Sequence, residues 1–459
     1  MENITIEACA AEGKALTHWN GVVVFVPFAV PGDVVDIRVT KKSKNYYEGF
    51  VERIVTPSKD RLEPFCQHFG VCGGCKWQPL PYPMQLEAKR QQVYDQLVRI
   101  GHLNVPEIRP TIPSDKIQYY RNKLEFTFSS KRWLLKDEDI ESVPENDRMG
   151  LGFHVGKFFD KVLDIKHCYL QKDPSNDIRL FIKKYAVENG LDFFDIRQNV
   201  GYVRNMFIRT TDTGDLMVIM CFFYENREDR EKMLDAIAEA FPQITSLYYI
   251  INNKLNDSIG DQECILYKGE PTIRETMESL TFRIGPKSFY QTNSEQAYKL
   301  YSVARDFAEL TGNEIVYDLY TGTGTIAQFV SGKAAKVIGI EYVPEAIEDA
   351  KVNAAGNGIT NCEFFAGDMK DVLRRDFINE HGQPDVIILD PPRAGIHPDV
   401  AKVILEASPA RMVYVSCNPA SQARDLALFA DKYEITAVQP VDMFPHTQHV
   451  ENVCALRLR

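Results

Sequence analysis

The alternation of strand and helix patterns in the second half of the chain restricts its fold more than any other feature. From about Thr281 onward, short apolar segments typical of buried strands alternate with helical segments. The strand segments are EIVYDLY, KVIGIEY, CEFFAG, DVIILD and RMVYVSC. Such alternation predicts a parallel sheet with helices on both faces, because each connection between parallel strands must cross over the sheet. We therefore expect a doubly wound, mostly parallel α/β domain whose chemistry lies at the carboxyl ends of its strands.

The first half of the chain predicts two further domains. Its first sixty residues are rich in valine and aromatic residues and lack a helical period, which indicates a small β-barrel or sandwich. From about Tyr119 to about Leu280, strand patterns alternate with few helices, as in an α+β domain. Between these segments lie a cysteine-rich loop, FCQHFGVCGGCKWQ, and a helical segment, MQLEAKRQQVYDQLVRI. A chain of 459 residues suits about three domains.

The overall charge does not decide whether the protein binds a nucleic acid, whereas the absence of export signals indicates where in the cell it is expected. The formal net charge is -11, but nucleic-acid binding depends on local patches rather than on the whole-chain charge. One such patch consists of three lysines and two tyrosines: Lys41, Lys42, Lys44, Tyr46 and Tyr47. These residues either bind RNA phosphates and bases or protect the edge of a strand from pairing. Because the sequence shows neither a secretion signal nor eighteen consecutive apolar residues, we expect a cytoplasmic protein without a membrane span.

A glycine-rich turn follows the first strand of the predicted parallel sheet. In DLYTGTGTIAQFV the glycines would let a ligand approach the backbone at the start of a helix. Gly322, Gly324 and Ala327 also fit the G-x-G-x-x-A pattern of dinucleotide-binding proteins. Glu341 ends the next strand, where a carboxylate can accept hydrogen bonds from ribose hydroxyls. These residues fit NAD and S-adenosylmethionine equally.

Later strand ends carry residues that suit chemistry on a nucleobase. Asp390 begins Asp-Pro-Pro-Arg, which forms either a stiff platform for a planar base or a plain turn. Cys417 follows the next buried strand, where its thiol is either an accessible nucleophile or a small core residue. Glu451 lies in an apolar strand, where a carboxylate must be paired or functional. His446 and His449 could support the site or be structural.

The cysteine-rich loop predicts a metal centre. It contains three cysteines in a C-x5-C-x2-C pattern, Cys66, Cys72 and Cys75. A zinc site would commonly take its fourth ligand from a nearby cysteine or histidine pair, which is absent, whereas an iron–sulfur cluster accepts a remote cysteine. Cys168 is the best-placed fourth ligand, although spacing does not separate it from Cys221 or Cys264. The residues favour an iron–sulfur cluster and leave zinc open.

Taken together, these motifs resemble the RNA uracil-5-methyltransferases, specifically the branch with an N-terminal TRAM domain and a [4Fe-4S] cluster. The motifs occur in the family's order: FYQTN, DLYTGTGT, GIEYVPEA, DPPRAG, SCNP and HVENV. The resemblance implies an OB-like TRAM β-barrel at 1–60 and a central α+β iron–sulfur domain at 61–81 and 110–280. It implies a Rossmann-like S-adenosylmethionine-dependent methyltransferase domain at 82–109 and 281–459. We also expect a monomer.

The resemblance assigns roles to individual residues. Four positions match the family's cluster ligands, Cys66, Cys72, Cys75 and Cys168, and five match its cofactor pocket, Gln291, Tyr320, Glu341, Asp368 and Asp390. Cys417 matches the nucleophile that adds to carbon 6 of uracil, which activates carbon 5 for methylation. Glu451 matches the base that then removes the proton from carbon 5. The TRAM domain and the cluster favour 23S ribosomal RNA as the substrate.

Three alternatives remain at this point. The first is a tRNA uracil-5-methyltransferase with the same mechanism. The second is an iron–sulfur RNA-binding protein with an inactive methyltransferase domain, although Cys417 and Glu451 are both intact. The third is a dehydrogenase, which the nucleobase motifs of the second half disfavour.

Overall fold

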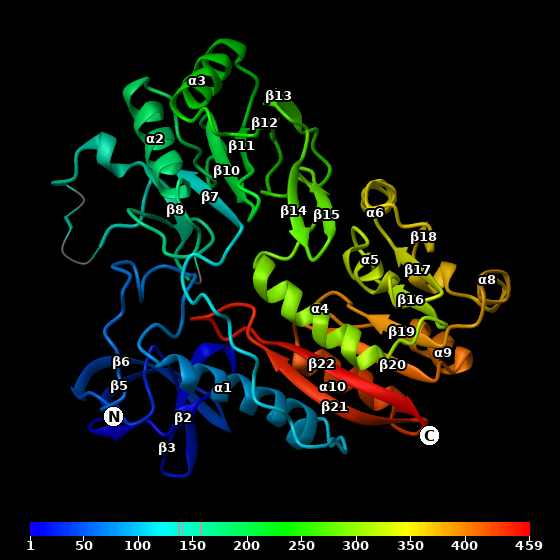
Figure 1. Cartoon of the computed structure of the whole chain (residues 1–459). Helices are drawn as coiled ribbons and strands as arrows, with labels where there is room; N and C mark the ends of the chain where they lie inside the picture. Colours follow the sequence, from blue (N-terminus) through cyan, green and yellow to red (C-terminus); the bar gives the residue numbers. More distant parts are fainter. Residues whose placement is uncertain (136–137, 140, 157) are drawn as a thin grey trace.

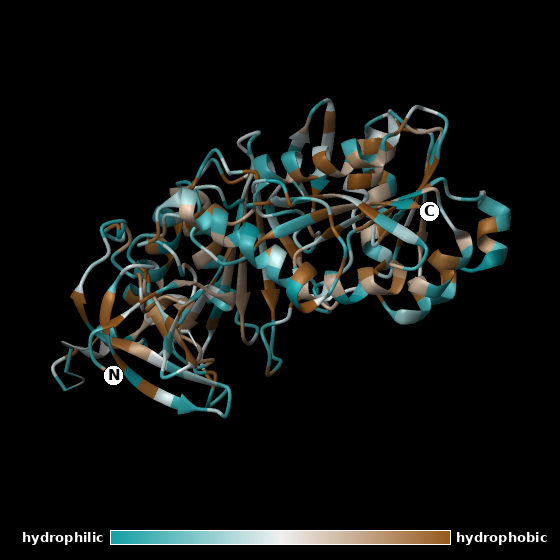
Figure 2. Cartoon of the chain, turned by 90° about the horizontal axis from the view of Figure 1, so that it is seen from below, coloured by the Kyte–Doolittle hydropathy of each residue, from teal (hydrophilic) through white to brown (hydrophobic). Residues whose placement is uncertain are grey.

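The computed structural model describes residues 1–135, 138–139, 141–156 and 158–459, which form three domains (Figure 1). Each domain is built on a β sheet, and a short ribbon of two strands joins the second domain to the third. Apolar residues concentrate in the sheets and on the helix faces that cover them, while polar residues occupy the outer turns (Figure 2). None of the helices in the described part of the chain is long and apolar enough to cross a membrane.

The N-terminal domain is a single six-stranded sheet in the order β1-β5-β6-β4-β3-β2. The strands are β1 (Ile4–Thr5), β2 (Ala8–Cys9), β3 (Lys14–Trp19), β4 (Val22–Pro27), β5 (Val34–Lys42) and β6 (Tyr46–Thr56). Alternate residues of β4 and β5 point into a small apolar core that contains Val24, Val26, Val35 and Ile37. The turn between β5 and β6 presents the cluster of lysines and tyrosines. Lys41 lies over the Tyr46 ring and Lys42 over the Tyr47 ring.

The central domain contains a seven-stranded sheet in the order β13-β12-β11-β10-β7-β8-β9. Its strands are β7 (Lys123–Ser129), β8 (Gly150–His154), β9 (Val162–Asp164), β10 (Val203–Thr210), β11 (Leu216–Phe222), β12 (Ser246–Ile251) and β13 (Ile265–Gly269). Helices α2 (Ser175–Glu188) and α3 (Arg227–Ala240) cover one face. Apolar residues of the other face, among them Phe207, Ile219 and Cys221, share a core with the third domain. The central α+β architecture agrees with the prediction.

The third domain begins with the ribbon β14 (Ile273–Met277) and β15 (Leu280–Ile284) and contains a seven-stranded sheet in the order β18-β17-β16-β19-β20-β22-β21. Five strands are parallel: β16 (Ile315–Leu319), β17 (Lys336–Glu341), β18 (Cys362–Ala366), β19 (Val386–Leu389) and β20 (Arg411–Ser416). The chain then returns in β21 (Tyr433–Val441) and β22 (Glu451–Leu458), and β22 is antiparallel to both β20 and β21.

Helices cover both faces of this sheet. On one face lie α4 (Ser294–Ala308), α5 (Thr325–Ser331) and α6 (Pro344–Gly356). On the other lie α7 (Met369–Val372), α8 (Arg375–His381), α9 (Pro398–Ala407) and α10 (Pro419–Phe429). The predicted doubly wound, mostly parallel sheet is therefore confirmed.

An early helix also packs against the third domain, although the central domain follows it in the sequence. Helix α1 (Tyr82–Tyr94) continues into the short π-helical segment η2 (Asp95–Ile100). Val93 and Leu97 belong to the same apolar core as Leu389, Tyr414 and Leu426 of the third domain. Figure 1 shows α1 alongside β21, β22 and α10.

Candidate active site

Strand register brings Cys417 and Glu451 together. Ser416 of β20 lies opposite Asn452 of β22 in the antiparallel pair. Because Cys417 follows Ser416 and Glu451 precedes Asn452, this register places the candidate nucleophile beside the candidate base. Asp390 reaches the same edge of the sheet, since it follows Leu389 at the end of the neighbouring parallel strand β19.

Burial raises the pKa values of all three groups. Desolvation, and then the charges of Glu451 and Asp390, raise the pKa of the Cys417 thiol to about 11, while Arg393 acts in the opposite direction. Glu451 is buried, and desolvation together with the charge of Asp390 raises the pKa of its carboxyl well above the usual value. Burial also raises the pKa of Asp390 to about 7. The three groups therefore interact, and ionising one makes it harder to ionise the others.

The loop that carries Cys417 is held by the start of α10. Asn418 caps this helix, because its Oδ1 accepts a hydrogen bond of 3.2 Å from the Ala420 N–H. The Asn418 Nδ2 and the Ser421 Oγ each donate a hydrogen bond of 3.1 Å to the Arg393 carbonyl. These bonds fix the Asp-Pro-Pro-Arg loop to the nucleophile loop. The position before a helix N-terminus also favours a thiolate, because the helix dipole is positive there.

A reciprocal amide pair fixes the strands behind the two side chains. Gln422 of α10 donates from Nε2 to the carbonyls of Tyr414, at 2.9 Å, and Asn452, at 3.2 Å. Asn452 donates in return from Nδ2 to the Gln422 Oε1, at 2.8 Å. Both amides are completely buried, so losing either partner would leave polar groups unsatisfied. The relative position of β20 and β22, and with it that of Cys417 and Glu451, is thereby fixed.

The glycine turn lies at the end of β16, as the sequence predicted. The buried Asp318 carboxylate accepts hydrogen bonds from the Thr321 hydroxyl and from the Ala327 N–H, which holds the turn against α5. Gly324 has a φ of +74°, and a Cβ there would lie 2.8 Å from the Ala350 Cβ. Glycine is therefore required at this position by both the backbone conformation and the packing.

Two carboxylates, those of Glu341 and Asp368, lie near the glycine turn and Tyr320. Glu341, at the end of β17, accepts a hydrogen bond of 3.1 Å from the Gly322 N–H. Burial, followed by the charges of nearby carboxylates that include Asp368 and Glu341, raises the pKa of Tyr320 to about 12. The carboxylates of Glu341 and Asp368 therefore lie near the Tyr320 hydroxyl. Asp368 is partly exposed and forms an ion pair of 3.1 Å with Lys370.

Gln291 and a residue missed by the sequence analysis, Tyr301, lie between the glycine turn and the Cys417 side of the site. The Gln291 side chain lies close to the hydroxyl of Tyr301, a buried residue of α4. Burial and the charge of Asp390 raise the pKa of Tyr301. In the sequence, Tyr301 follows the apolar spacing of α4 and is indistinguishable from an ordinary core residue. The Gln291 carbonyl is held in turn by Asn122 of the central domain, at 2.9 Å.

The two histidines near Glu451 differ in their surroundings. Desolvation lowers the pKa of both to about 4, so both are neutral. The charge of Arg393 also acts on His449, which places this ring near the site. His446 is buried against residues from the first hundred of the chain, and its carbonyl accepts hydrogen bonds from the Lys76 and Trp77 N–H groups.

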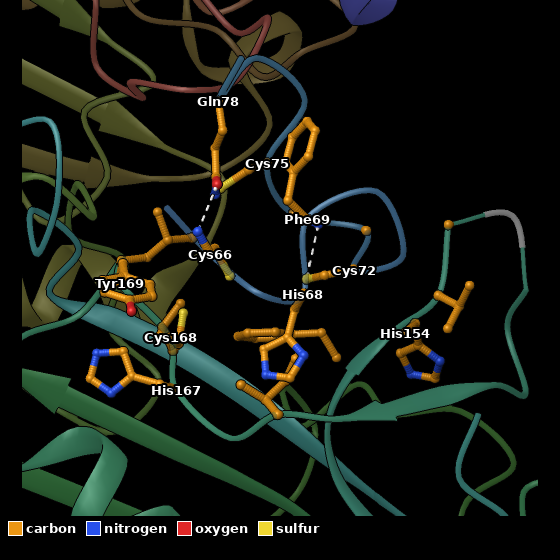
Figure 3. Close-up of a pocket in the computed structure, with 18 of the residues that line it drawn as sticks. Cys66, His68, Phe69, Cys72, Cys75, Gln78, His154, His167, Cys168 and Tyr169 are labelled. Carbon is orange, nitrogen blue, oxygen red and sulfur yellow. Dashed lines mark hydrogen bonds between the residues drawn. The ribbon is translucent and has the colours of Figure 1, made fainter. Parts of the chain in front are cut away.

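Away from this site, a cavity of about 600 Å³ in the central domain is lined by four cysteines (Figure 3). Three come from the loop before α1, Cys66, Cys72 and Cys75, and the fourth is Cys168, after β9. Cys221 and Cys264 instead pack in the core between the central and third domains. The structure therefore groups Cys168, and neither of the other two candidates, with the cysteine loop.

The chemistry of this cavity suits a cation, but a metal site is not shown. Desolvation, and then the charges of the three other cysteines, raise the pKa of the Cys72 thiol to about 12. Four thiolates would repel one another there unless a metal compensated their charge. Within the described residues, no group of three or more histidine, cysteine or acidic side chains has a geometry that holds a metal ion. The predicted iron–sulfur centre therefore lacks support from this geometry.

The doubly wound sheet, the glycine turn and the acidic strand ends fit an S-adenosylmethionine-dependent methyltransferase fold, and similarity to known proteins identifies it as one. The sequence model of the tRNA (uracil-5-)-methyltransferases matches residues 209–459, and that of the TRAM domain matches residues 2–51. The chain belongs to the tRNA (uracil-5-)-methyltransferase family and is an RNA methyltransferase with an N-terminal TRAM domain. Membership of this family excludes the dehydrogenase interpretation.

Individual relatives match over the full length. An uncharacterized RNA methyltransferase of Porphyromonas gingivalis is 59% identical, and the match covers 97% of this chain and 98% of the relative. Another RNA methyltransferase, from Bacteroides thetaiotaomicron, is 58% identical, and the match covers 98% of this chain and 100% of the relative. Among solved structures, the Pyrococcus abyssi tRNA (uracil-54, C5)-methyltransferase in complex with S-adenosyl-L-homocysteine is similar, with a TM-score of 0.76 and 29% identity. That match covers 99% of this chain and 100% of the other.

Proposed function

We propose that this protein methylates carbon 5 of a specific uridine in 23S ribosomal RNA, with Cys417 as the nucleophile and Glu451 as the base. The observation that carries the proposal is the cross-strand adjacency of these two side chains beside Asp390. The reaction needs a nucleophile before methyl transfer and a base after it. The Cys417 thiol and the Glu451 carboxyl, which lie at the same edge of the sheet, provide these two groups.

The order of steps follows from the chemistry of uracil. Cys417 adds as a thiolate to carbon 6, which makes carbon 5 nucleophilic enough to take a methyl group. S-adenosylmethionine supplies that group and would be held by the residues around the glycine turn, Gln291, Tyr320, Glu341 and Asp368. The ionised form of Glu451 then accepts the proton from carbon 5, and the Cys417 sulfur leaves as a thiolate while the ring regains its double bond. The raised pKa of Glu451 makes its carboxylate a stronger base than a carboxylate in water.

A uridine in tRNA is the second candidate substrate. The family description and the Pyrococcus abyssi enzyme both favour it, because each is named for tRNA. Mapping 5-methyluridine in ribosomal RNA and tRNA from cells that lack the gene separates the two. We expect the loss of one 5-methyluridine from 23S ribosomal RNA, and its loss from tRNA alone would refute the ribosomal assignment.

We also propose that the cysteine cavity binds a [4Fe-4S] cluster through Cys66, Cys72, Cys75 and Cys168. The proposal is supported by the shared cavity and by the mutual charge interaction of the four thiols. A cluster of four irons is larger than a single ion, so its ligands surround a cavity rather than converge on one point. When bound, it would connect the cysteine loop to the central domain.

A further inference from the structure

The loop that precedes Glu451 is under conformational strain. Residues 442–450, named here the base loop, connect β21 to β22, and Val441 and Glu451 face each other across its ends. His446, in the middle of this loop, has a φ of +63°, a left-handed conformation that residues other than glycine rarely adopt. Such a conformation persists only where surrounding contacts enforce it. The base loop therefore depends on contacts from outside itself.

Those contacts come from residues more than three hundred positions earlier. The N–H groups of Lys76 and Trp77 donate to the His446 carbonyl, at 2.8 and 3.0 Å. Gln85 of α1 is completely buried, and its Oε1 accepts a hydrogen bond of 2.8 Å from the His446 N–H. The Gln85 Nε2 donates to the carbonyls of Trp77 and Leu80, at 3.0 and 2.8 Å. Both the N–H and the carbonyl of His446 are thus hydrogen-bonded by residues 76–85.

An ion pair fixes the start of the same loop. Lys89 of α1 and Asp442 are both completely buried, and the Lys89 ammonium is bonded to the Asp442 carboxylate. Lys89 also donates to the Phe444 carbonyl at 3.0 Å, and the Tyr82 hydroxyl donates to Asp442 at 2.9 Å. Asp442 directly follows Val441, the cross-strand partner of Glu451. A buried ion pair of this kind is rigid, because separating its charges would leave each of them uncompensated.

We propose that residues 76–89 form a clamp on the base loop, in which Gln85 and Lys89 are positioning residues that hold Glu451 in line with carbon 5 of the uracil. The inference rests on the proposed function of Glu451 as the base. Proton removal is sensitive to geometry, and a displacement of about 1 Å costs on the order of 10²-fold in rate. Loosening the clamp therefore slows proton removal more than it slows the earlier addition and methyl transfer.

The test compares two identical substitutions on α1. Gln85→Met keeps the side-chain length and removes its hydrogen bonds to the base loop. Gln91→Met is the matched control, since Gln91 is exposed and its side chain donates a hydrogen bond of 2.9 Å to Asp95, the first residue of η2, rather than to the base loop. Each full-length variant is mixed with the unmodified RNA transcript that the parent enzyme methylates and with methyl-labelled S-adenosylmethionine. Denaturing gels then separate the methylated covalent protein–RNA adduct from the released RNA.

We expect Gln85→Met to release product about 10- to 100-fold more slowly and to accumulate the labelled adduct. Gln91→Met should behave as the parent, and both variants should retain the parent affinity for S-adenosylhomocysteine. If Gln85→Met proves unstable, the pair Lys89→Met with Asp442→Asn, which removes both buried charges, should accumulate the same adduct. A folded clamp variant that releases RNA at the parent rate would overturn the clamp. A parent enzyme that forms no adduct with 5-fluorouridine RNA would instead overturn the proposed function.

Discussion

Replacing Glu451 by glutamine tests the central chemical assignment. The change keeps the size of the side chain and removes its ability to accept a proton. Because burial already favours the neutral form of Glu451, glutamine replaces a neutral group and the fold should be retained. Addition of Cys417 and methyl transfer remain possible, whereas removal of the proton from carbon 5 stalls.

The size of the effect follows from the surroundings of Glu451. General base catalysis is worth roughly 10²- to 10⁴-fold. Asp390 is the neighbouring carboxyl whose charge acts on Glu451, and its pKa of about 7 leaves it partly ionised at neutral pH. Asp390 can therefore remove the proton slowly from a less suitable position. We expect release of methylated RNA to fall by about 10²-fold or more.

The assay follows a methylated, covalently linked RNA on a denaturing gel. Glu451→Gln should accumulate this species, and the parent enzyme should form the same kind of adduct with 5-fluorouridine RNA, which has no proton at carbon 5. Cys417→Ala should form neither the adduct nor methylated RNA. Turnover of Glu451→Gln at the parent rate would show that another group is the base, and an adduct with Cys417→Ala would refute the nucleophile assignment.

Three further predictions concern the cysteine cavity, the TRAM domain and pH. Anaerobically purified protein should contain about four irons per chain; Cys168→Ser should lose them and Cys221→Ser should not, while stoichiometric zinc would contradict the cluster. Replacing Lys41, Lys42 and Lys44, at the turn between β5 and β6, by alanine should lower the slope of log K for RNA binding against log salt concentration by up to about three units. Cofactor affinity should be unchanged, and an unaltered slope would exclude this surface as an RNA-binding site. Burial raises the pKa of Asp318 from 3.8 to about 7, so its stabilising contribution is complete below about pH 4 and is lost as the pH rises through 7. Urea unfolding between pH 5 and 8 should show this loss, and an Asp318→Asn variant that does not flatten it would contradict the assignment.

The sequence determined the architecture of the third domain because the relevant signals are local. Alternating strand and helix patterns specify a doubly wound sheet, and all parallel strands of such a sheet end at one edge. The positions of Tyr320, Glu341, Asp390 and Cys417 at that edge could therefore be predicted without coordinates. Glycine spacing likewise predicted the turn after β16, since its backbone conformation depends on a few adjacent residues.

Long-range packing decided the rest. The antiparallel return of β22 places Glu451 beside Cys417, and the fold of the central domain brings Cys168, rather than Cys221 or Cys264, to the cysteine loop. The contact of α1 with the base loop, and the burial that raises the pKa of Glu451, likewise exist only in the folded chain. Contacts between segments hundreds of residues apart leave no periodic pattern in either segment, because each one satisfies only its own local geometry. For this reason the sequence could name candidate reacting groups, while the tertiary structure alone determined which of them meet and what holds them in place.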